Sequence, residues 1–305
     1  MSTQSRPSLW RVLSDTSRII SSNSLHFAAL SLLFIFPITL FNLIHALILP
    51  PSPFNFQIPS FGTSLILPKL LYGLALLIFN IFSVSSVTHS IFHAFHRNPI
   101  KISSSLKSIL PSFLPLLATK LAYFIVAFFD ISLGFGICMC FVWFGRMALG
   151  LEIGTTSRSF TVVVFAMTIL FFGLLVECCL MDAVVVVESK YGFAPLQRSS
   201  TLVKGMRHVA FLMIALPVIL QGIISWRFLV LGGGDGGVFL QLAVCAVLST
   251  ALTLFGVAAT TVLFIHCKAL NGESEELEFQ DKLGAVYVQL TRDVAELGLV
   301  YHDIK

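Results

Sequence analysis

Residues 160–187 read FTVVVFAMTILFFGLLVECCLMDAVVVV, and this stretch decides the fold. A helix needs about 20 apolar residues to cross a hydrocarbon core about 30 Å thick, and this run is longer than that. Apolar runs of spanning length occur six times, at 25–49, 65–87, 113–143, 160–187, 209–231 and 238–267. The sequence therefore predicts an all-α fold, a polytopic membrane helical bundle with six transmembrane helices.

The composition agrees with a chain whose solvent is the bilayer. Hydrophobic residues make up 56% of the chain and charged residues 11%, whereas soluble proteins are roughly a quarter charged. The net charge of +4 comes from local clusters, so no nucleic-acid partner is expected. The six cysteines lie in or against apolar runs without a CxxC pair. We therefore expect no disulfide framework, no metal site and no cofactor.

Lysine and arginine occupy alternate gaps between the apolar runs. Segments 1–24, 88–112, 188–208 and 268–305 together carry 14 of them, and the opposite side carries 3, Arg146, Arg158 and Arg227. Lys69 and Lys120 lie inside runs. The positive-inside rule then predicts that both termini are cytoplasmic. The membrane is expected to be the endoplasmic reticulum or another endomembrane, with the plasma membrane as the alternative.

The same pattern divides the chain into three parts. Residues 1–24 form a cytoplasmic segment with an interfacial helix, residues 25–268 the transmembrane domain, and residues 269–305 an acidic cytoplasmic tail that is a candidate site for a protein partner. The third run is too long for one straight span. We expect it to tilt, to break near Gly134 and Gly136, or to extend past the membrane.

Three cytoplasmic segments have basic, amphipathic helical patterns typical of helices in the membrane interface. The first places Leu9 and Val12 on one face; the second places Ile102 and Leu106 opposite Ser105. The third covers residues 193–204. Each precedes two spans, so the chain reads as three units of interfacial helix and hairpin, about 90 residues each. The alternative is that any cytoplasmic loop between spans looks basic and amphipathic.

The third segment belongs to a longer motif, residues 184–205, VVVVESKYGFAPLQRSSTLVKG. Gly192 permits the turn out of the fourth span, and Gly205 suits the C-cap of the helix that follows. Arg198, Lys204 and Arg207 are then expected to contact anionic lipid headgroups, at about 1 kcal/mol each.

This motif resembles a plant family of uncharacterised six-span membrane proteins. It is also distantly similar to the membrane domain associated with bacterial glycerophosphodiester phosphodiesterases. The resemblance implies a six-span fold and no established substrate or catalytic residue. The soluble phosphodiesterase domain has no counterpart in these residues, so we do not expect that activity.

Lys120 is joined inside the apolar runs by three acidic residues, Asp130, Glu177 and Asp182. Each needs a partner, water or a role, because a central charge costs about 2.5–3.5 kcal/mol. Counted at about 1.5 Å per residue from the cytoplasmic edge, Lys120 and Asp182 lie about 10 and 9 Å deep, so an ion pair is expected. Glu177, about 16 Å deep by this count, is a candidate for a transport path or for a neutral interhelical hydrogen bond.

His89 and His93 share a helical face, and His96 follows them. No carboxylate or cysteine stands nearby in sequence, so we expect a cluster that faces solvent or headgroups rather than a metal site. The chain also lacks HExxH and GxSxG motifs.

These features predict a non-enzymatic integral membrane protein. Its interfacial helices would organise contacts with the lipid bilayer or a partner at the cytoplasmic face. The alternative is a small-solute or lipid transporter that uses Glu177 and Lys120. An intramembrane enzyme is the third and weakest interpretation.

Overall fold

The structure, a computed structural model, describes residues 8–48, 66–96, 102–149, 158–231 and 238–273. Within these ranges the chain forms helices and turns without a strand. The helices, in chain order, are α1 Leu9–Ser22, α2 Ser24–Leu30, the π-helix η1 Ser31–Ile35, α3 Phe36–Ile48, α4 Ile66–Phe95, α5 Ile102–Lys107, α6 Ile109–Leu149, α7 Arg158–Cys178, α8 Met181–Glu188, α9 Ala194–Val203, α10 Arg207–Leu231 and α11 Val238–Leu270.

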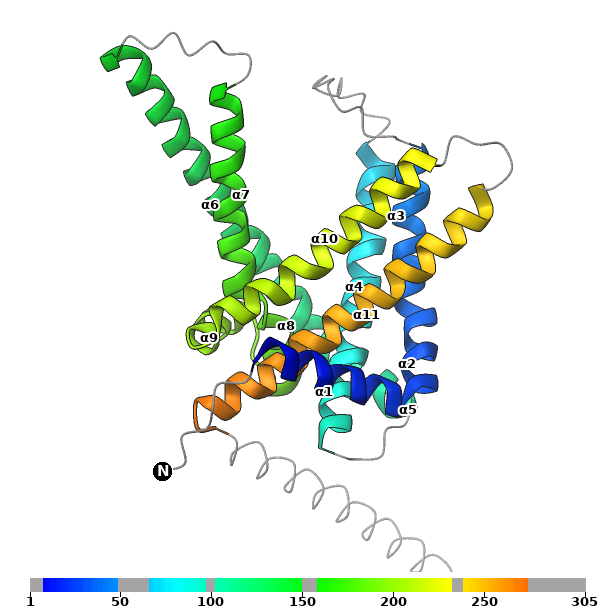
Figure 1. The fold of residues 1–305 in the computed structure, drawn as a ribbon. Helices are drawn as coiled ribbons and strands as arrows, with labels where there is room; N and C mark the ends of the chain where they lie inside the picture. The colour runs from blue at the N-terminus through cyan, green and yellow to red at the C-terminus, as the bar shows by residue number, and fades with distance from the viewer. Residues whose placement is uncertain (1–7, 49–65, 97–101, 150–157, 232–237, 274–305) are drawn as a thin grey trace, which may run out of the picture.

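Six helical segments of the described chain are long and apolar enough to cross a membrane, which confirms the predicted all-α, multi-pass architecture. They are Ser24–His45, Leu67–Phe95, Ile109–Cys140, Phe165–Glu188, Arg207–Arg227 and Leu240–Leu270. The short helices α1, α5 and α9 lie at the same end of the bundle, drawn at the bottom of Figure 1. We call this the basic end, because it carries the basic segments that precede each pair of spans.

The third span is one continuous helix without a break at its glycines. Helix α6 is 41 residues long, or about 61 Å at about 1.5 Å per residue, twice the thickness of a hydrocarbon core. Gly134 serves close packing instead: a Cβ there would lie 2.6 Å from Leu170 Cδ1 of α7. Small residues of this kind let two membrane helices approach closely. The α6–α7 hairpin leans away from the other spans (Figure 1).

The first span is helical throughout but not uniform. Its middle, η1, is a π-helical turn that ends two residues before Pro37. Proline lacks an N–H and its ring crowds the preceding turn, and a π-turn is one of the ways in which a helix accommodates such a residue.

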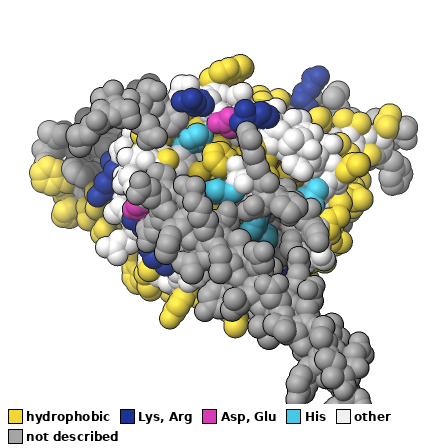
Figure 2. All heavy atoms as spheres, turned by 90° about the horizontal axis from the view of Figure 1, so that it is seen from below, with side chains coloured by type: hydrophobic (Ala, Val, Ile, Leu, Met, Phe, Trp, Pro, Cys, Tyr) yellow, Lys and Arg dark blue, Asp and Glu magenta, His cyan; other side chains and the backbone are white. Residues whose placement is uncertain are grey.

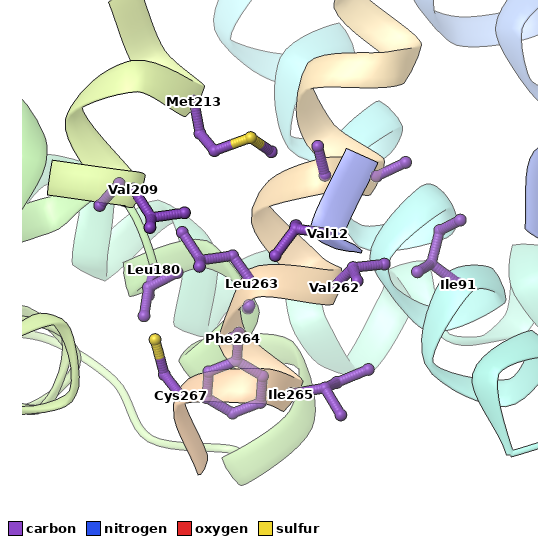
Figure 3. Close-up of a cluster of buried hydrophobic side chains, with 14 of the residues drawn as sticks. Val12, Ile91, Leu180, Val209, Met213, Val262, Leu263, Phe264, Ile265 and Cys267 are labelled. Carbon is purple, nitrogen blue, oxygen red and sulfur yellow. The ribbon is translucent and has the colours of Figure 1, made fainter. Parts of the chain in front are cut away.

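The core lies towards the basic end and surrounds the C-terminal half of α11. Val262, Leu263 and Phe264 are consecutive and all fully buried, as expected for a helix that is enclosed on every side. Around them lie side chains from α1, α4, α8 and α10, among them Val12 and Ile91 (Figure 3). Helix α1 therefore shares the core of the spanning helices.

The short helices α1 and α5 place different faces of their amphipathic patterns against the protein. Helix α1 buries Val12 of its apolar face. In α5 the serine face packs on protein: Ser105 is fully buried and bonds Ser90 of α4 at 2.8 Å, while Ile102 and Leu106 of the apolar face are exposed. Lipid is as apolar as a leucine side chain, so hydroxyls gain more from the inside of a membrane bundle than apolar groups do.

The turn into α9 follows the predicted geometry at one glycine and departs from it at the other. Gly192 has φ +73°, a left-handed conformation that glycine adopts readily. Gly205 does not adopt a positive φ: α9 ends at Val203, and Lys204 after it is still right-handed helical. Our expectation of a glycine C-cap there was wrong, because the chain turns into α10 without a left-handed residue.

Candidate functional site

The fourth span is interrupted near the basic end. Helix α7 ends at Cys178 and α8 begins at Met181. Ser199 of α9 bridges the interruption: its Oγ donates to the carbonyl oxygen of Glu177 at 2.6 Å and accepts from the N–H of Leu180 at 3.1 Å. Backbone groups freed inside a membrane bundle need such partners, because no bulk water is available to them. One buried hydroxyl thus fixes α9 to the broken span.

Ion pairs lie on two sides of the interruption. Lys120 Nζ of α6 lies 2.7 Å from Asp182 Oδ2, in the first turn of α8. A carboxylate there is also stabilised by the helix N-terminus. On the other side, Arg207 Nη2 of α10 lies 3.0 Å from Glu177 Oε1. The two carboxylates therefore belong to different helices and have different basic partners.

The structure places the residues expected inside the spans as follows. It brings Lys120 and Asp182 together as the expected ion pair. Glu177 lies beside α9 and the first turn of α10, through the contacts of its carbonyl oxygen with Ser199 and of its carboxylate with Arg207. The depth count assumed a straight helix through the turn at Cys179, and the interruption invalidates that assumption. Asp130 is partly buried on α6, and the described residues give it no ion pair.

The three basic residues expected to contact headgroups differ in their surroundings. Arg198 is held within the protein, 3.6 Å from Glu188 and in contact with Glu273. Lys204 is exposed and has no ion pair among the described residues. Arg207 remains 55% exposed despite its pair with Glu177. Lys204 and Arg207 thus remain accessible from outside the protein at the corner between α9 and α10.

Glu188 is a centre of charge that the sequence did not single out. Its carboxylate lies 2.8 Å from Lys190 Nζ and 3.3 Å from Lys268 Nζ of α11, in addition to its contact with Arg198. The Lys268 side chain is only 6% exposed, so its charge is almost wholly enclosed. A glutamate that ends an apolar run and a lysine near the end of another were the available signals. Together they tie α8, α9 and α11.

Helix α1 is fixed at the same end by a further polar contact. Asp15 Oδ2 lies 3.2 Å from His266 Nε2 of α11, and Asp15 Oδ1 lies 3.2 Å from Arg18. Figure 2 views this end and shows Lys and Arg, Asp and Glu, and His side chains gathered on it. Charges of both signs therefore meet at the basic end.

The histidines in α4 and directly after it, His89, His93 and His96, are partly buried rather than fully exposed to solvent. The His89 and His93 rings have centroids 4.3 Å apart, and His96 Nδ1 lies 2.8 Å from the Phe92 carbonyl oxygen. The described part of the chain contains no group of three or more His, Cys, Asp or Glu residues placed to hold a metal ion.

An apolar groove runs between α7 and α10, which diverge from the α9 corner (Figure 1). Its volume is about 830 Å³. Its walls are mostly hydrophobic, whereas Glu177, Arg207 and His208 line its end nearest α9. The groove therefore combines an apolar length with a charged end.

A second cavity, between α3, α10 and α11, has a different character. Its volume is about 560 Å³, and no charged residue lines it. It lies farther along α10 from the basic end, and its polar lining consists of Thr39, Asn42, Gln221, Ser225 and Thr253. Neither Lys120 nor Glu177 lines this cavity.

Comparison with known protein families gave one match. A family model described as a domain of unknown function, DUF8558, matches residues 54–296, which include five of the six spans. No curated protein and no solved structure matched the chain. The resemblance of residues 184–205 to the plant and bacterial membrane proteins stays a prediction.

Proposed function

The chain belongs to the DUF8558 family, and from this premise we propose that it is a non-enzymatic multi-pass membrane protein that organises lipid contacts at the cytoplasmic membrane face. In this proposal the basic end faces the cytoplasm. The supporting observation is the corner between α9 and α10, where Lys204 and Arg207 are exposed next to apolar spanning helices. A cation so placed attracts anionic headgroups by about 1 kcal/mol.

The assignment of roles within the motif follows from the ion pairs. Arg198 forms ion pairs with Glu188 and Glu273, so its role is to stabilise the fold. Lys204 has no ion pair among the described residues, so its whole charge is available to lipid. The function therefore rests most directly on Lys204, with Arg207 as its neighbour.

This proposal is tested in cells with Lys204→Gln. The matched control is Arg227→Gln, which removes one exposed positive charge near the opposite end of the spanning part of α10. We expect Lys204→Gln to alter the protein's location or the lipid composition around it, and Arg227→Gln to alter neither. If both folded variants behave like the wild type, Lys204 has no lipid role.

A second candidate function is transport of a small solute or a lipid. The observation that favours it is the interruption between Glu177 and Asp182, because discontinuous helices often form the substrate sites of transporters. Glu177 would then line the path at the basic end, and Lys120 would hold Asp182. Flux into liposomes that is unchanged by Glu177→Gln would remove Glu177 from this function.

The acidic tail and the compartment complete the proposal. Residues 269–305 would bind a cytoplasmic protein; beyond Glu273 they lie outside the described residues. We place the protein in the endoplasmic reticulum or another endomembrane, with the plasma membrane as the alternative. Proximity labelling from the C-terminus tests both points, since it reports neighbouring proteins and the compartment together.

A further inference from the structure

We propose that the groove between α7 and α10 binds one phosphatidylethanolamine molecule, with an acyl chain along the groove, its phosphate on Arg207 and its ammonium group on Glu177. This inference deepens the proposed lipid-contact function and rests on it. It adds a specific site, a lipid class and an orientation that exposed cations at a membrane surface do not require.

The length of the groove fits one leaflet. On α10 its lining extends from Arg207 to Ile219, about 18 Å at about 1.5 Å per residue. Half of a hydrocarbon core is about 15 Å thick. An acyl chain from the leaflet at the basic end can therefore follow the groove while its headgroup stays at the charged end. Phe172 of α7 and Phe211 of α10 line this path with ring centroids 6.1 Å apart, and Val176 and Leu212 also line it.

The charged end offers both signs to a ligand. Arg207 and Glu177 are 3.0 Å apart, yet their side chains remain 55% and 44% exposed. Arginine binds phosphate oxygens through several N–H donors, and a carboxylate accepts hydrogen bonds from an ammonium group. A zwitterionic headgroup can therefore engage the pair without leaving either charge unmatched.

Other headgroups fit this end less well. A headgroup with only a phosphate charge would place that charge beside the Glu177 carboxylate, and such a mismatch selects against it. A trimethylammonium group carries charge but has no N–H donor for Glu177, unlike a primary ammonium. His208 is exposed at the same end, and its ring N–H can donate a further hydrogen bond to the lipid phosphate. The pair thus favours phosphatidylethanolamine over phosphatidylglycerol and phosphatidylcholine.

The groove can be filled without disturbing its walls. Gly173 lines it, and a Cβ at this position would meet no atom within 4 Å. Gly173→Phe should therefore occupy the space of an acyl chain. Gly136→Phe is the matched control, because Gly136 is equally open and lines an uncharged hollow on α6.

The test is native mass spectrometry of the full chain released from nanodiscs that contain equal parts of phosphatidylethanolamine, phosphatidylcholine and phosphatidylglycerol. We expect the wild type and Gly136→Phe to retain one phosphatidylethanolamine that Gly173→Phe loses. Glu177→Gln should lower the preference for phosphatidylethanolamine over phosphatidylglycerol about tenfold, or about 1.4 kcal/mol. Glu177→Asp should keep the preference, and thermal unfolding identifies variants that fail to fold.

Two outcomes overturn the inference. One is retention of the same lipid by Gly173→Phe and the wild type; the other is an unchanged headgroup preference in folded Glu177→Gln. Lys204→Gln separates this result from the proposed function, because Lys204 does not line the groove. That variant should keep the bound phosphatidylethanolamine even where it loses contacts with anionic lipid.

Discussion

The side-chain oxygen of Ser199 accepts a hydrogen bond from the backbone N–H of Leu180 across 3.1 Å. The same hydroxyl donates to the Glu177 carbonyl oxygen on the other side of the helix interruption. Ser199→Ala should leave both groups without a partner and destabilise the protein by about 1–3 kcal/mol. Thermal unfolding in detergent measures this loss.

The control for Ser199→Ala is Thr201→Ala. Thr201 is exposed on the same helix, and its hydroxyl donates to the nearby Arg198 carbonyl oxygen at 2.7 Å. This variant should unfold at nearly the wild-type temperature. Equal losses in the two variants would mean that the interruption does not depend on Ser199.

The close approach of α6 and α7 at Gly134 gives a second prediction. Gly134→Val should destabilise the hairpin by about 1–3 kcal/mol, because the new side chain would meet Leu170 and Met167. Gly136→Val places the same β-branched residue two positions away, where no atom lies within 4 Å. Thermal unfolding of the two variants isolates the packing effect, and indistinguishable results would contradict the close approach.

Lys120 and Asp182 provide a double-mutant test. Lys120→Met and Asp182→Leu should each cost about 2.5–3.5 kcal/mol, because each leaves one charge without its partner within a span. The double variant should be more stable than either single variant, since it removes both charges. If the loss of unfolding free energy in the double variant equals the sum of the losses in the two single variants, the two side chains do not interact.

In the charge cluster around Glu188, substitutions of Glu188 and of Lys190 should reduce the stability of the protein by different amounts. Glu188→Gln should destabilise the protein by about 3–5 kcal/mol, because it leaves the enclosed charge of Lys268 uncompensated. Lys190→Gln should cost at most about 1 kcal/mol, since Lys190 is 44% exposed and its pair is screened by water. Chemical denaturation in micelles measures both, and a larger loss from Lys190→Gln would contradict this arrangement.

The sequence predicted the helical architecture because bilayer thickness fixes the length of an apolar run. It also anticipated the contact between Lys120 and Asp182, since both depths were counted over short distances from the basic end. The position of Glu177 could not be predicted in this way. No proline or glycine marks the interruption at Cys179, and its bridging partner, Ser199, comes from a different helix.

Helix α5 shows a second limit of sequence patterns. Periodicity identified its serine face and its apolar face, but it did not say which face packs on protein. Ser105 turns inward to Ser90, while Leu106 turns outward. Both sides of a membrane helix can meet apolar surroundings, so small hydroxyl residues decide the contact. The groove between α7 and α10 could not be predicted from the sequence either, because its width depends on the angle at which the two helices diverge.

Site-specific crosslinking to lipid tests the central claim most directly. A photoreactive benzoylphenylalanine replaces Thr201, which is exposed on α9 near Lys204. The crosslinked lipid is then counted in bilayers of phosphatidylglycerol and phosphatidylcholine. The account predicts that phosphatidylglycerol is preferred and that adding Lys204→Gln lowers this preference about fivefold, as about 1 kcal/mol per cation requires. Equal crosslinking to both lipids, unchanged by Lys204→Gln, would contradict a lipid-organising role for this surface.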